Sequence, residues 1–264
     1  MTITLPLRGS KPRTVRIAEG SGGKARVEVL GAPLGERGRA RLVEVVRRVL
    51  NLDEDLAPLY DVAREDPELA WIVSGSGRMF RSPTVFEDVV KTICTTNCTW
   101  AATVRMVGAI VEYLGEPSVG GHGRAFATPE AMAAAPEAFY RDATRAGYRG
   151  AYLRALAASV AEGTLDLEAL AAAPQEELSD DELARALLEL PGVGPYAAAH
   201  IMMLVGRHSR LILDSWTRPT YASLNGRKAT DRQIERRFRR YGRYAGLAFW
   251  LYLTRDWVAE ETAR

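Results

Sequence analysis

The chain opens with apolar and polar residues in alternation and then changes to the spacing typical of helices. Short alternating runs occur at residues 3–5, 14–17 and 25–30, separated by Gly, Pro and Ser. Alternation with a period of two places every second side chain on one face of a strand. We therefore expect a small antiparallel sheet at the N-terminus of a chain that is otherwise helical.

Beyond residue 38 the apolar residues recur three or four positions apart, as in helices with one buried face. Two capping-box patterns, Thr84 with Glu87 and Ser179 with Glu182, predict where two of these helices begin. The polar run at 95–99 is rich in poor helix formers and predicts a break. Further helices are expected at 39–50, 56–63, 67–73, 100–114, 151–162, 179–190 and 196–205.

Length and composition limit the class of protein. The 264 residues fit one large domain or two modest ones, and 47% apolar with 26% charged residues is typical of a soluble globular protein. Disorder is excluded as the dominant state. No apolar run approaches the roughly 18 residues that span a bilayer, and the N-terminus lacks the apolar core of a signal peptide. We expect an intracellular protein with no membrane partner.

The two cysteines, Cys94 and Cys98, do not suggest a metal or disulfide framework. A secreted disulfide scaffold uses more cysteines, and an iron–sulfur cluster needs four. With three histidines in the whole chain, a zinc site is not expected either. The two thiols are interpreted as small, reduced, buried side chains, and no metal site is predicted.

The net charge of +2 hides an asymmetry along the chain. Residues 162–189 contain nine acids and one base, and residues 207–243 contain eleven bases and three acids. A basic flank on a globular protein is typical of a nucleic-acid binder. From charge alone, solvated helix faces with ordinary ion pairs explain the pattern equally well.

A short turn with two glycines, LPGVGP at residues 190–195, joins two of the predicted helices. Gly192 and Gly194 allow positive φ and close approach of another backbone. The amides of Gly192, Val193 and Gly194 lie at a helix start, where unpaired N–H groups suit a phosphate oxygen. Pro195 sits near the first helical position, where its missing N–H costs least. A tight helix–helix turn that binds no ligand has the same pattern. Only the residues on either side of the turn can distinguish it from a phosphate-binding turn.

Asp214 follows three aliphatic residues, in LILD at 211–214, and precedes the expected start of another helix. An acid in that place is often an N-cap. The positive end of the helix dipole also favours a negative charge there, so the carboxylate is well placed to act on a ligand. Both roles are open for Asp214.

These motifs resemble the DNA glycosylases of base excision repair that carry a helix–hairpin–helix, the HhH-GPD superfamily. LPGVG followed by LILD resembles the family's hairpin and its following aspartate. FEDVVKTICTTN at 86–97, AGYRGAYL at 146–153 and FRRYGRYAG at 238–246 resemble the 8-oxoguanine glycosylase branch. The N-terminal strands resemble the small sheet that this branch shares with bacterial 3-methyladenine glycosylases. The resemblance implies a mainly helical α+β fold with two helical subdomains that flank a DNA-binding cleft.

The resemblance also implies a reaction. Such enzymes flip a damaged base out of double-stranded DNA and cleave its N-glycosidic bond. Asp214 matches the family's carboxylate, which stabilises the oxocarbenium-like sugar and orients or deprotonates water. Asn97 matches the side chain that contacts the orphaned partner base, while hairpin residues 192–194 and Tyr196 are expected at the phosphates. No cofactor is implied, apart from a structural monovalent cation that backbone carbonyls hold at the hairpin in this family.

Some positions depart from the family's pattern. Bifunctional members carry a Schiff-base lysine two residues after the second hairpin glycine, where this chain has Tyr196, so hydrolysis without strong lyase activity is expected. His200 stands in place of a base-facing cysteine, and Phe249 in place of a base-reading glutamine. With Trp216 and Trp250, these side chains are expected to form a base pocket that favours electron-poor rings such as cationic alkylated purines. Ordinary packing remains the alternative for each of them.

The resemblance divides the chain into three expected parts: a β domain at 1–38, a helical subdomain at 39–83 plus 207–264, and another at 84–206 that ends in the hairpin. The protein is expected to be a monomer, cytoplasmic or associated with the nucleoid. Two alternative functions stay open. One is a non-catalytic DNA-binding or damage-recognition protein that keeps the hairpin, and the other is a bifunctional glycosylase/lyase that uses another lysine, such as Lys91.

Overall fold

A computed structural model describes the backbone of residues 1–262 and the side chains of residues 1–257. The chain forms two compact units. Unit 1 comprises Met1–Leu50, Arg81–Ala171 and Leu190–Gly192, and unit 2 comprises Asn51–Phe80, Ala172–Glu189 and the chain from Val193 onward. These limits differ from the expected divisions after residues 38, 83 and 206, and one of them falls inside the glycine-bearing turn.

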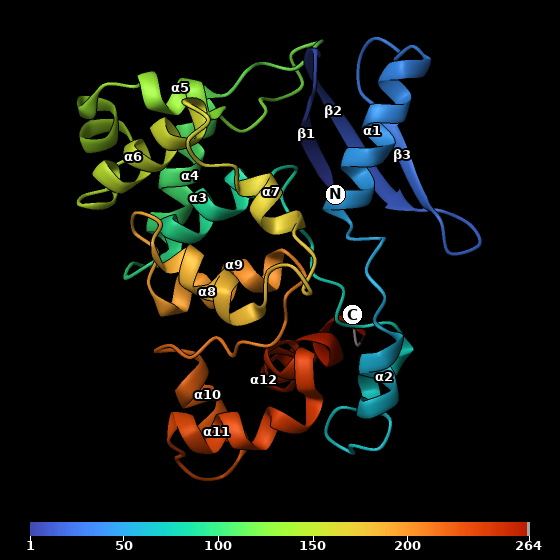
Figure 1. Ribbon diagram of the computed structural model, residues 1–264. Coiled ribbons are helices and arrows are strands. Elements are labelled where there is room, and N and C mark those ends of the chain that lie inside the picture. Colours follow the sequence, from blue (N-terminus) through green and yellow to red (C-terminus); the bar gives the residue numbers. More distant parts are fainter. Residues whose placement is uncertain (263–264) are drawn as a thin grey trace. The chain divides into compact units, whose positions relative to one another are not determined.

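Unit 1 begins with the expected antiparallel sheet, in the order β1 (Thr2–Leu7), β2 (Ser10–Glu19) and β3 (Ala25–Val29). Helix α1 (Glu36–Val49) lies against this sheet in Figure 1. Its apolar stripe, Leu42, Val46 and Val49, shares one buried cluster with the inward residues of β1 and β2. Because α1 buries its apolar face on the sheet, it belongs to unit 1 with the strands, and not to unit 2 with α2, the next helix in the chain.

The other helices of unit 1 are α3 (Val85–Thr95), α4 (Trp100–Leu114), α5 (Pro129–Ala134), α6 (Arg149–Ala161) and α7 (Leu167–Ala172), with a π-helical turn η2 at Phe139–Ala143. The Thr84 hydroxyl caps α3 by accepting a hydrogen bond from the N–H of Glu87 at 3.2 Å. The Glu87 carboxylate pairs with Lys91, with Nζ and Oε1 2.5 Å apart. The predicted break between α3 and α4 is confirmed.

Unit 2 contains α2 (Ala57–Ala63), α8 (Asp180–Leu188), α9 (Pro195–Leu204), α10 (Thr217–Leu224), α11 (Asp231–Phe238) and α12 (Ala245–Thr262), with 3-10 turns η1 (Ala70–Ser74) and η3 (Arg239–Tyr244). The capping box of Ser179 and Glu182 is present at the start of α8, as predicted. The helix expected at 67–73 is instead the 3-10 turn η1. In the part of the chain that the structure describes, no helix is long and apolar enough to cross a membrane.

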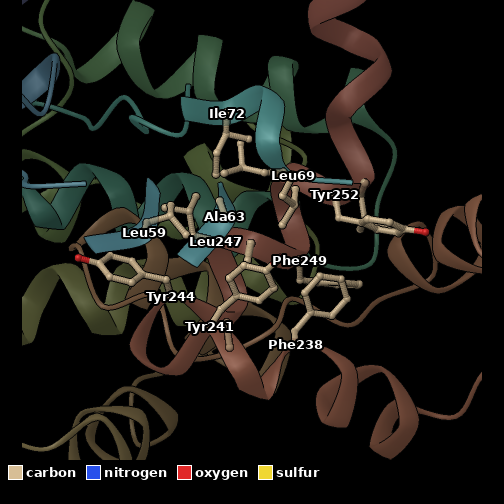
Figure 2. Packing of buried hydrophobic residues seen from close by; sticks show 14 of the residues in the cluster. Leu59, Ala63, Leu69, Ile72, Phe238, Tyr241, Tyr244, Leu247, Phe249 and Tyr252 are labelled. Carbon is tan, nitrogen blue, oxygen red and sulfur yellow. The ribbon is translucent and has the colours of Figure 1, made fainter. Parts of the chain in front are cut away.

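The core of unit 2 is rich in aromatic side chains (Figure 2). Phe238, Phe249 and Tyr252 are buried, and the Phe238 ring centroid lies 5.2 Å from that of Phe249 and 5.7 Å from that of Tyr252. Leu69 and Ile72 pack into the same cluster. Burying one large apolar side chain stabilises a fold by about 1.5–3 kcal/mol. This cluster therefore gives α11 and α12 a firm support within unit 2.

Candidate functional site

The turn between α8 and α9 needs glycine at one of its two glycine positions. Gly192 has a φ of +79°, and a Cβ there would lie 2.9 Å from Cδ2 of Tyr152. Gly194 is extended, with a φ of −101°, and a Cβ there would meet nothing within 4 Å. Gly194 is the N-cap of α9 and Pro195 its first residue. The first N–H groups of a helix have no acceptor within it, so this turn presents donors suited to an anion.

Asp214 lies just before α10, as the sequence predicts. Its Oδ1 atom accepts hydrogen bonds from the backbone N–H groups of Trp216 and Thr217, at 2.8 and 2.6 Å. The N–H of Asp214 donates in return to Oγ1 of Thr217 at 2.8 Å, which closes a reciprocal cap. From the residues that the structure describes, the second oxygen, Oδ2, receives no hydrogen bond. One side chain therefore caps the helix and keeps an oxygen for a ligand.

Tyr196 and His200 lie one turn apart on α9, with their ring centroids 5.8 Å from each other. Burial lowers the pKa of His200, and the nearby negative charge of Asp214 acts in the opposite direction. The His200 side chain is half-buried, and its Nδ1 atom is buried with no hydrogen-bond partner among the described residues. The imidazole is therefore neutral at neutral pH and lies within electrostatic reach of Asp214.

Trp216, Trp250 and Trp257 form one aromatic cluster next to the cap of α10. The Trp216 ring centroid lies 5.7 Å from each of the other two, and those two are 6.2 Å apart. The Trp216 residue is 39% exposed and Trp257 is 55% exposed. Trp250 and Tyr196 pack against the same small apolar cluster of Ala199, Met203 and Ile212. Trp250 therefore lies between Trp216 on one side and the cluster that Tyr196 contacts on the other.

Trp257 is a member of this cluster that was not predicted from the sequence. Its place seven residues after Trp250 puts both rings on one face of α12, and this spacing could have identified it. Phe249, by contrast, lies in the core of unit 2, where its ring contacts Phe238 and Tyr221 at centroid distances of 5.2 and 6.2 Å. Phe249 is 0% exposed. Its placement agrees with the packing alternative, so we leave Phe249 out of the proposed base pocket.

Asn97 lies in the exposed loop between α3 and α4 of unit 1, with a φ of +45°. Its Nδ2 atom donates a hydrogen bond to the Tyr148 hydroxyl at 3.2 Å. The Arg149 guanidinium lies over the Tyr148 ring, 4.6 Å from the centroid, and its Nε atom donates to the carbonyl of Thr96 at 3.0 Å. Tyr148 and Arg149 therefore support the Asn97 loop, a role that was not predicted for them. An aromatic residue next to an arginine at the start of a helix is the sequence pattern that could have indicated it.

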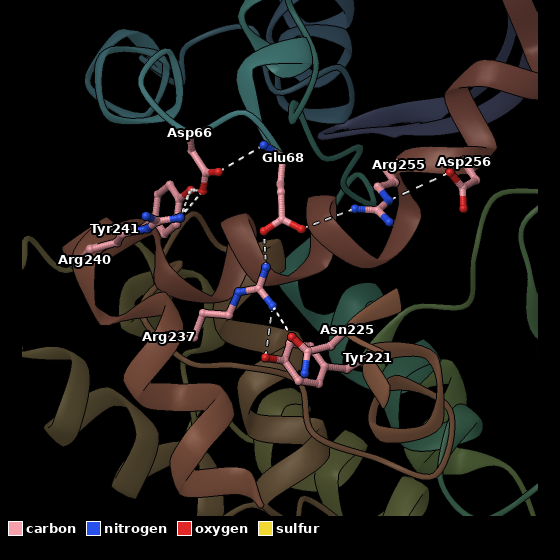
Figure 3. A network of polar contacts seen from close by, with 9 residues as sticks. All are labelled: Asp66, Glu68, Tyr221, Asn225, Arg237, Arg240, Tyr241, Arg255 and Asp256. Atoms are coloured by element: carbon pink, nitrogen blue, oxygen red, sulfur yellow. Dashed lines mark hydrogen bonds and ion pairs between the residues drawn. The ribbon is translucent and has the colours of Figure 1, made fainter. Parts of the chain in front are cut away.

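Ion pairs inside unit 2 account for much of the charge asymmetry. Five arginines of the basic segment each pair with a carboxylate: Arg207–Asp180, Arg210–Asp181, Arg218–Asp231, Arg237–Glu68 and Arg240–Asp66. The first two pairs join the basic segment to the acidic one. The last two belong to the network in Figure 3, in which Arg237 also donates to Asn225 and to the Tyr221 hydroxyl. Each of these five arginines therefore already has a carboxylate partner within unit 2.

A cavity of about 570 Å³ opens in unit 2 between α8, α9 and α11. Its walls include Tyr196, and also Leu213 and Arg218, which stand on either side of Asp214 in the chain. Its lining includes apolar residues of α9, such as Ala199 and Met202, and charged residues of α8 and α11. The segment that carries Asp214 therefore borders a space of the size that small ligands occupy in proteins.

The cysteines have the surroundings of structural thiols. Both are free, with Cys94 buried and Cys98 half-buried. Burial raises the pKa of the Cys94 thiol to about 12, which makes it unreactive. Within the described residues, no three His, Cys, Asp or Glu side chains are grouped so that they could hold a metal ion.

No protein-family model and no curated protein sequence matches the chain. Solved structures do match. The 8-oxoguanine glycosylase/lyase of Clostridium acetobutylicum has a TM-score of 0.71 at 22% identity, over 95% of this chain and 88% of that one. The 3-methyladenine DNA-glycosylase of Archaeoglobus fulgidus has a TM-score of 0.74 at 20% identity, over 97% and 87%. The 3-methyladenine DNA glycosylase of Schizosaccharomyces pombe has a TM-score of 0.57 at 17% identity, over 78% and 98%. The expected fold is confirmed.

Proposed function

We propose that the protein is a monofunctional DNA glycosylase of base excision repair, which hydrolyses the N-glycosidic bond of a damaged purine flipped out of double-stranded DNA. One observation carries the proposal: two backbone N–H groups fix the Asp214 carboxylate before α10 and leave its Oδ2 atom for a ligand. The likeness of the fold to glycosylases of two substrate classes supports it. Three of the similar structures contain DNA, which supports DNA as the partner inside the cell.

Asp214 has the chemistry that this reaction needs. Cleavage of the N-glycosidic bond develops positive charge on the deoxyribose, and a fixed carboxylate stabilises that charge. The same group can orient or deprotonate the water that attacks the sugar. Because hydrogen bonds already hold Oδ1, the carboxylate needs little reorganisation as the charge develops. The neutral imidazole of His200 adds no competing positive charge at neutral pH.

The hairpin and the Asn97 loop complete the proposal. The backbone N–H groups of residues 192–194 and the start of α9 at Tyr196 would hold phosphates beside the flipped nucleotide. Asn97, supported by the Tyr148 hydroxyl, would contact the orphaned partner base. A monovalent cation on carbonyl groups of the turn would strengthen the phosphate contact, and potassium-dependent affinity for duplex DNA would reveal it.

Hydrolysis without strand cleavage is proposed because Tyr196 cannot form the Schiff base of a lyase. The similar protein from Clostridium acetobutylicum is described as a glycosylase/lyase, so the fold alone does not separate the two activities. Lys91, the alternative amine, is engaged within unit 1. Its Nζ atom lies 2.5 Å from Oε1 of Glu87 and 5.8 Å from the centroid of the Phe126 ring.

Alkylated purines are the proposed substrate class. The exposed face of Trp216 and the adjoining Trp250 offer an electron-rich surface, which attracts a cationic ring more than a neutral one. Two of the similar proteins are described as 3-methyladenine glycosylases, which supports this choice.

A panel of labelled duplexes tests the proposal, each with one lesion such as 7-methylguanine, 3-methyladenine, hypoxanthine or 8-oxoguanine. We expect free base from an alkylated purine and intact strands until alkali is added. Strand cleavage without alkali would support the bifunctional alternative. Tight binding to a lesion with no release of any base in the panel would support a non-catalytic damage-recognition protein and overturn the proposal.

A further inference from the structure

The eleven bases of residues 207–243 fall into distinct sets in the structure. Five pair with carboxylates, as described above, and Arg243 lies over the Tyr244 ring, 4.8 Å from its centroid. The other five are exposed, and among the described residues their side chains make no ion pair, hydrogen bond or ring contact: Arg227, Lys228, Arg232, Arg236 and Arg239. The sequence shows one basic segment, but only this last set is free to bind a partner.

The five arginines that pair with carboxylates are poorly placed to bind a partner as well. Arg237 donates to the Tyr221 hydroxyl at 3.1 Å and to Oδ1 of Asn225 at 2.8 Å, and its guanidinium lies 4.4 Å from the centroid of the Tyr252 ring (Figure 3). Arg218 binds both carboxylate oxygens of Asp231, at 2.8 and 2.9 Å. A DNA phosphate would have to replace these contacts and leave a carboxylate unpaired, which costs free energy.

The free set is ordered along α11. Arg232, Arg236 and Arg239 are four and three residues apart, so their side chains leave α11 and its continuation on one face. We call these three residues the α11 stripe. The exposed Glu235 stands at its edge and faces the cavity described above. Like charges at these spacings destabilise a helix. A polyanion laid along the stripe would remove this repulsion.

We propose that the α11 stripe, extended by Arg227 and Lys228 of the preceding loop, is a second DNA contact that binds backbone phosphates without reading sequence. Arg239 lies seven residues after Arg232, which corresponds to about 10 Å of helix and equals the axial rise of about three nucleotides of one DNA strand. Arginine suits phosphate because its guanidinium forms paired hydrogen bonds. Phe238, the aromatic residue of α11, is buried, so the stripe has no ring on which a base could stack.

This inference depends on the proposed function only for the identity of the partner. The stripe makes no contact with Asp214, so it should add affinity for any duplex, damaged or not, and leave the chemical step unchanged. Each phosphate contact contributes about 0.9 to the slope of log affinity against log salt concentration.

The test compares Arg232→Gln/Arg236→Gln/Arg239→Gln with a matched control, Lys11→Gln/Lys24→Gln/Arg26→Gln. The control removes three exposed charges from β2, β3 and the loop between them. Binding to an undamaged fluorescent duplex is measured by anisotropy from 50 to 300 mM potassium chloride. We expect the stripe variant to lose about 2–3 from the salt slope. The control should keep the wild-type slope, and thermal unfolding should show that both variants are folded.

Three results would overturn the inference. They are an unchanged slope for the stripe variant, an equal loss in the control, and stronger competition by duplex RNA than by duplex DNA. Base release from a damaged duplex at saturating enzyme is measured alongside. If the protein releases base but the stripe variant keeps the wild-type salt slope, the second DNA contact is disproved and the proposed glycosylase function stands. If the stripe variant loses part of the salt slope but the protein releases no base, the second DNA contact stands and the proposed function is disproved.

Discussion

The starts of α3 in unit 1 and α10 in unit 2 both hold carboxylates, but the fold uses them differently. Asp88 at α3 is buried, accepts the N–H of Ser82 at 2.8 Å and pairs with Arg48 at 3.3 Å. Asp214 is half-buried, and its hydrogen bonds come from the backbone of its own turn. A carboxylate that contacts distant residues and has lost its water belongs to the packing of the fold. One that the backbone alone positions keeps an oxygen for chemistry.

The largest expected effect is the loss of base release in Asp214→Asn. The amide oxygen can still accept the N–H groups of Trp216 and Thr217, so α10 should form, but the negative charge is gone. Removing one electrostatic stabiliser of a transition state lowers the rate by about 10²–10³-fold. Single-turnover release of the preferred base measures this, with duplex affinity as the control for folding. As a control, Asp88→Asn should release base at the wild-type rate. If Asp214→Asn also released base at the wild-type rate, Asp214 would have no catalytic role and the difference between the two carboxylates would be disproved.

The second-largest expected effect is the dependence of the free energy of unfolding on pH, which Asp88 causes. Burial raises the pKa of this carboxyl group to about 6, against an ordinary value of 3.8. Between these values the folded state holds more protons than the unfolded state, so the free energy of unfolding falls as pH rises. A raised pKa of about two units corresponds to about 3 kcal/mol.

Urea unfolding between pH 4 and pH 7 measures this dependence. Asp88→Asn removes the titrating group and keeps an acceptor for the N–H of Ser82, so the curve should flatten in that window. Glu87, whose pKa burial also raises, keeps a dependence of the same sign. If the free energy of unfolding of Asp88→Asn changed with pH as steeply as that of the wild type, ionisation of Asp88 would not destabilise the folded state.

A smaller effect is expected from the ring beside Asp214. Trp216→Ala should reduce release of a cationic base such as 7-methylguanine about tenfold relative to neutral hypoxanthine, because a cation over an aromatic face gains about 0.5–2 kcal/mol. The ratio of the two release rates is measured for the variant and for the wild type. Trp100→Ala, which removes an exposed ring from α4, is the control. Equal losses on both substrates would mean that Trp216 does not sense charge.

The smallest effect is expected at the Asn97 loop of unit 1. Tyr148→Phe keeps the ring beneath Arg149 and removes the hydroxyl that accepts from Asn97. One hydrogen bond contributes about 0.5–1.5 kcal/mol, so affinity for a duplex with an abasic site should fall a few-fold. The matched variant is Tyr113→Phe on α4, where the exposed ring packs against Phe139. If both variants bind equally well, the Tyr148 hydroxyl does not support the loop during binding.

Features with local causes were predictable. The three strands, the break after α3 and the cap of Ser179 follow from periodicity and from hydrogen bonds that reach three residues along the chain. The capping position of Asp214 has the same local cause. Its proposed role in catalysis stays a prediction, as do the roles of the other site residues.

Features that depend on distant residues were not predictable. The charge asymmetry suggested a basic flank, and the structure pairs Arg207 and Arg210 with carboxylates about thirty residues earlier in the chain. The resemblance predicted that Phe249 lies in a base pocket, but it packs in the core of unit 2. Trp257 joins the cluster of Trp216 because α12 returns to the cap of α10.

The sequence by itself determined the helical fold with its N-terminal sheet, the glycine-bearing turn and the carboxylate before α10, because short-range hydrogen bonds and hydrophobic spacing specify them. Only the tertiary structure decided which arginines are consumed by ion pairs, which aromatic rings lie in a core and which remain exposed. Those outcomes depend on packing between segments far apart in the chain, and a one-dimensional pattern contains no distances between them.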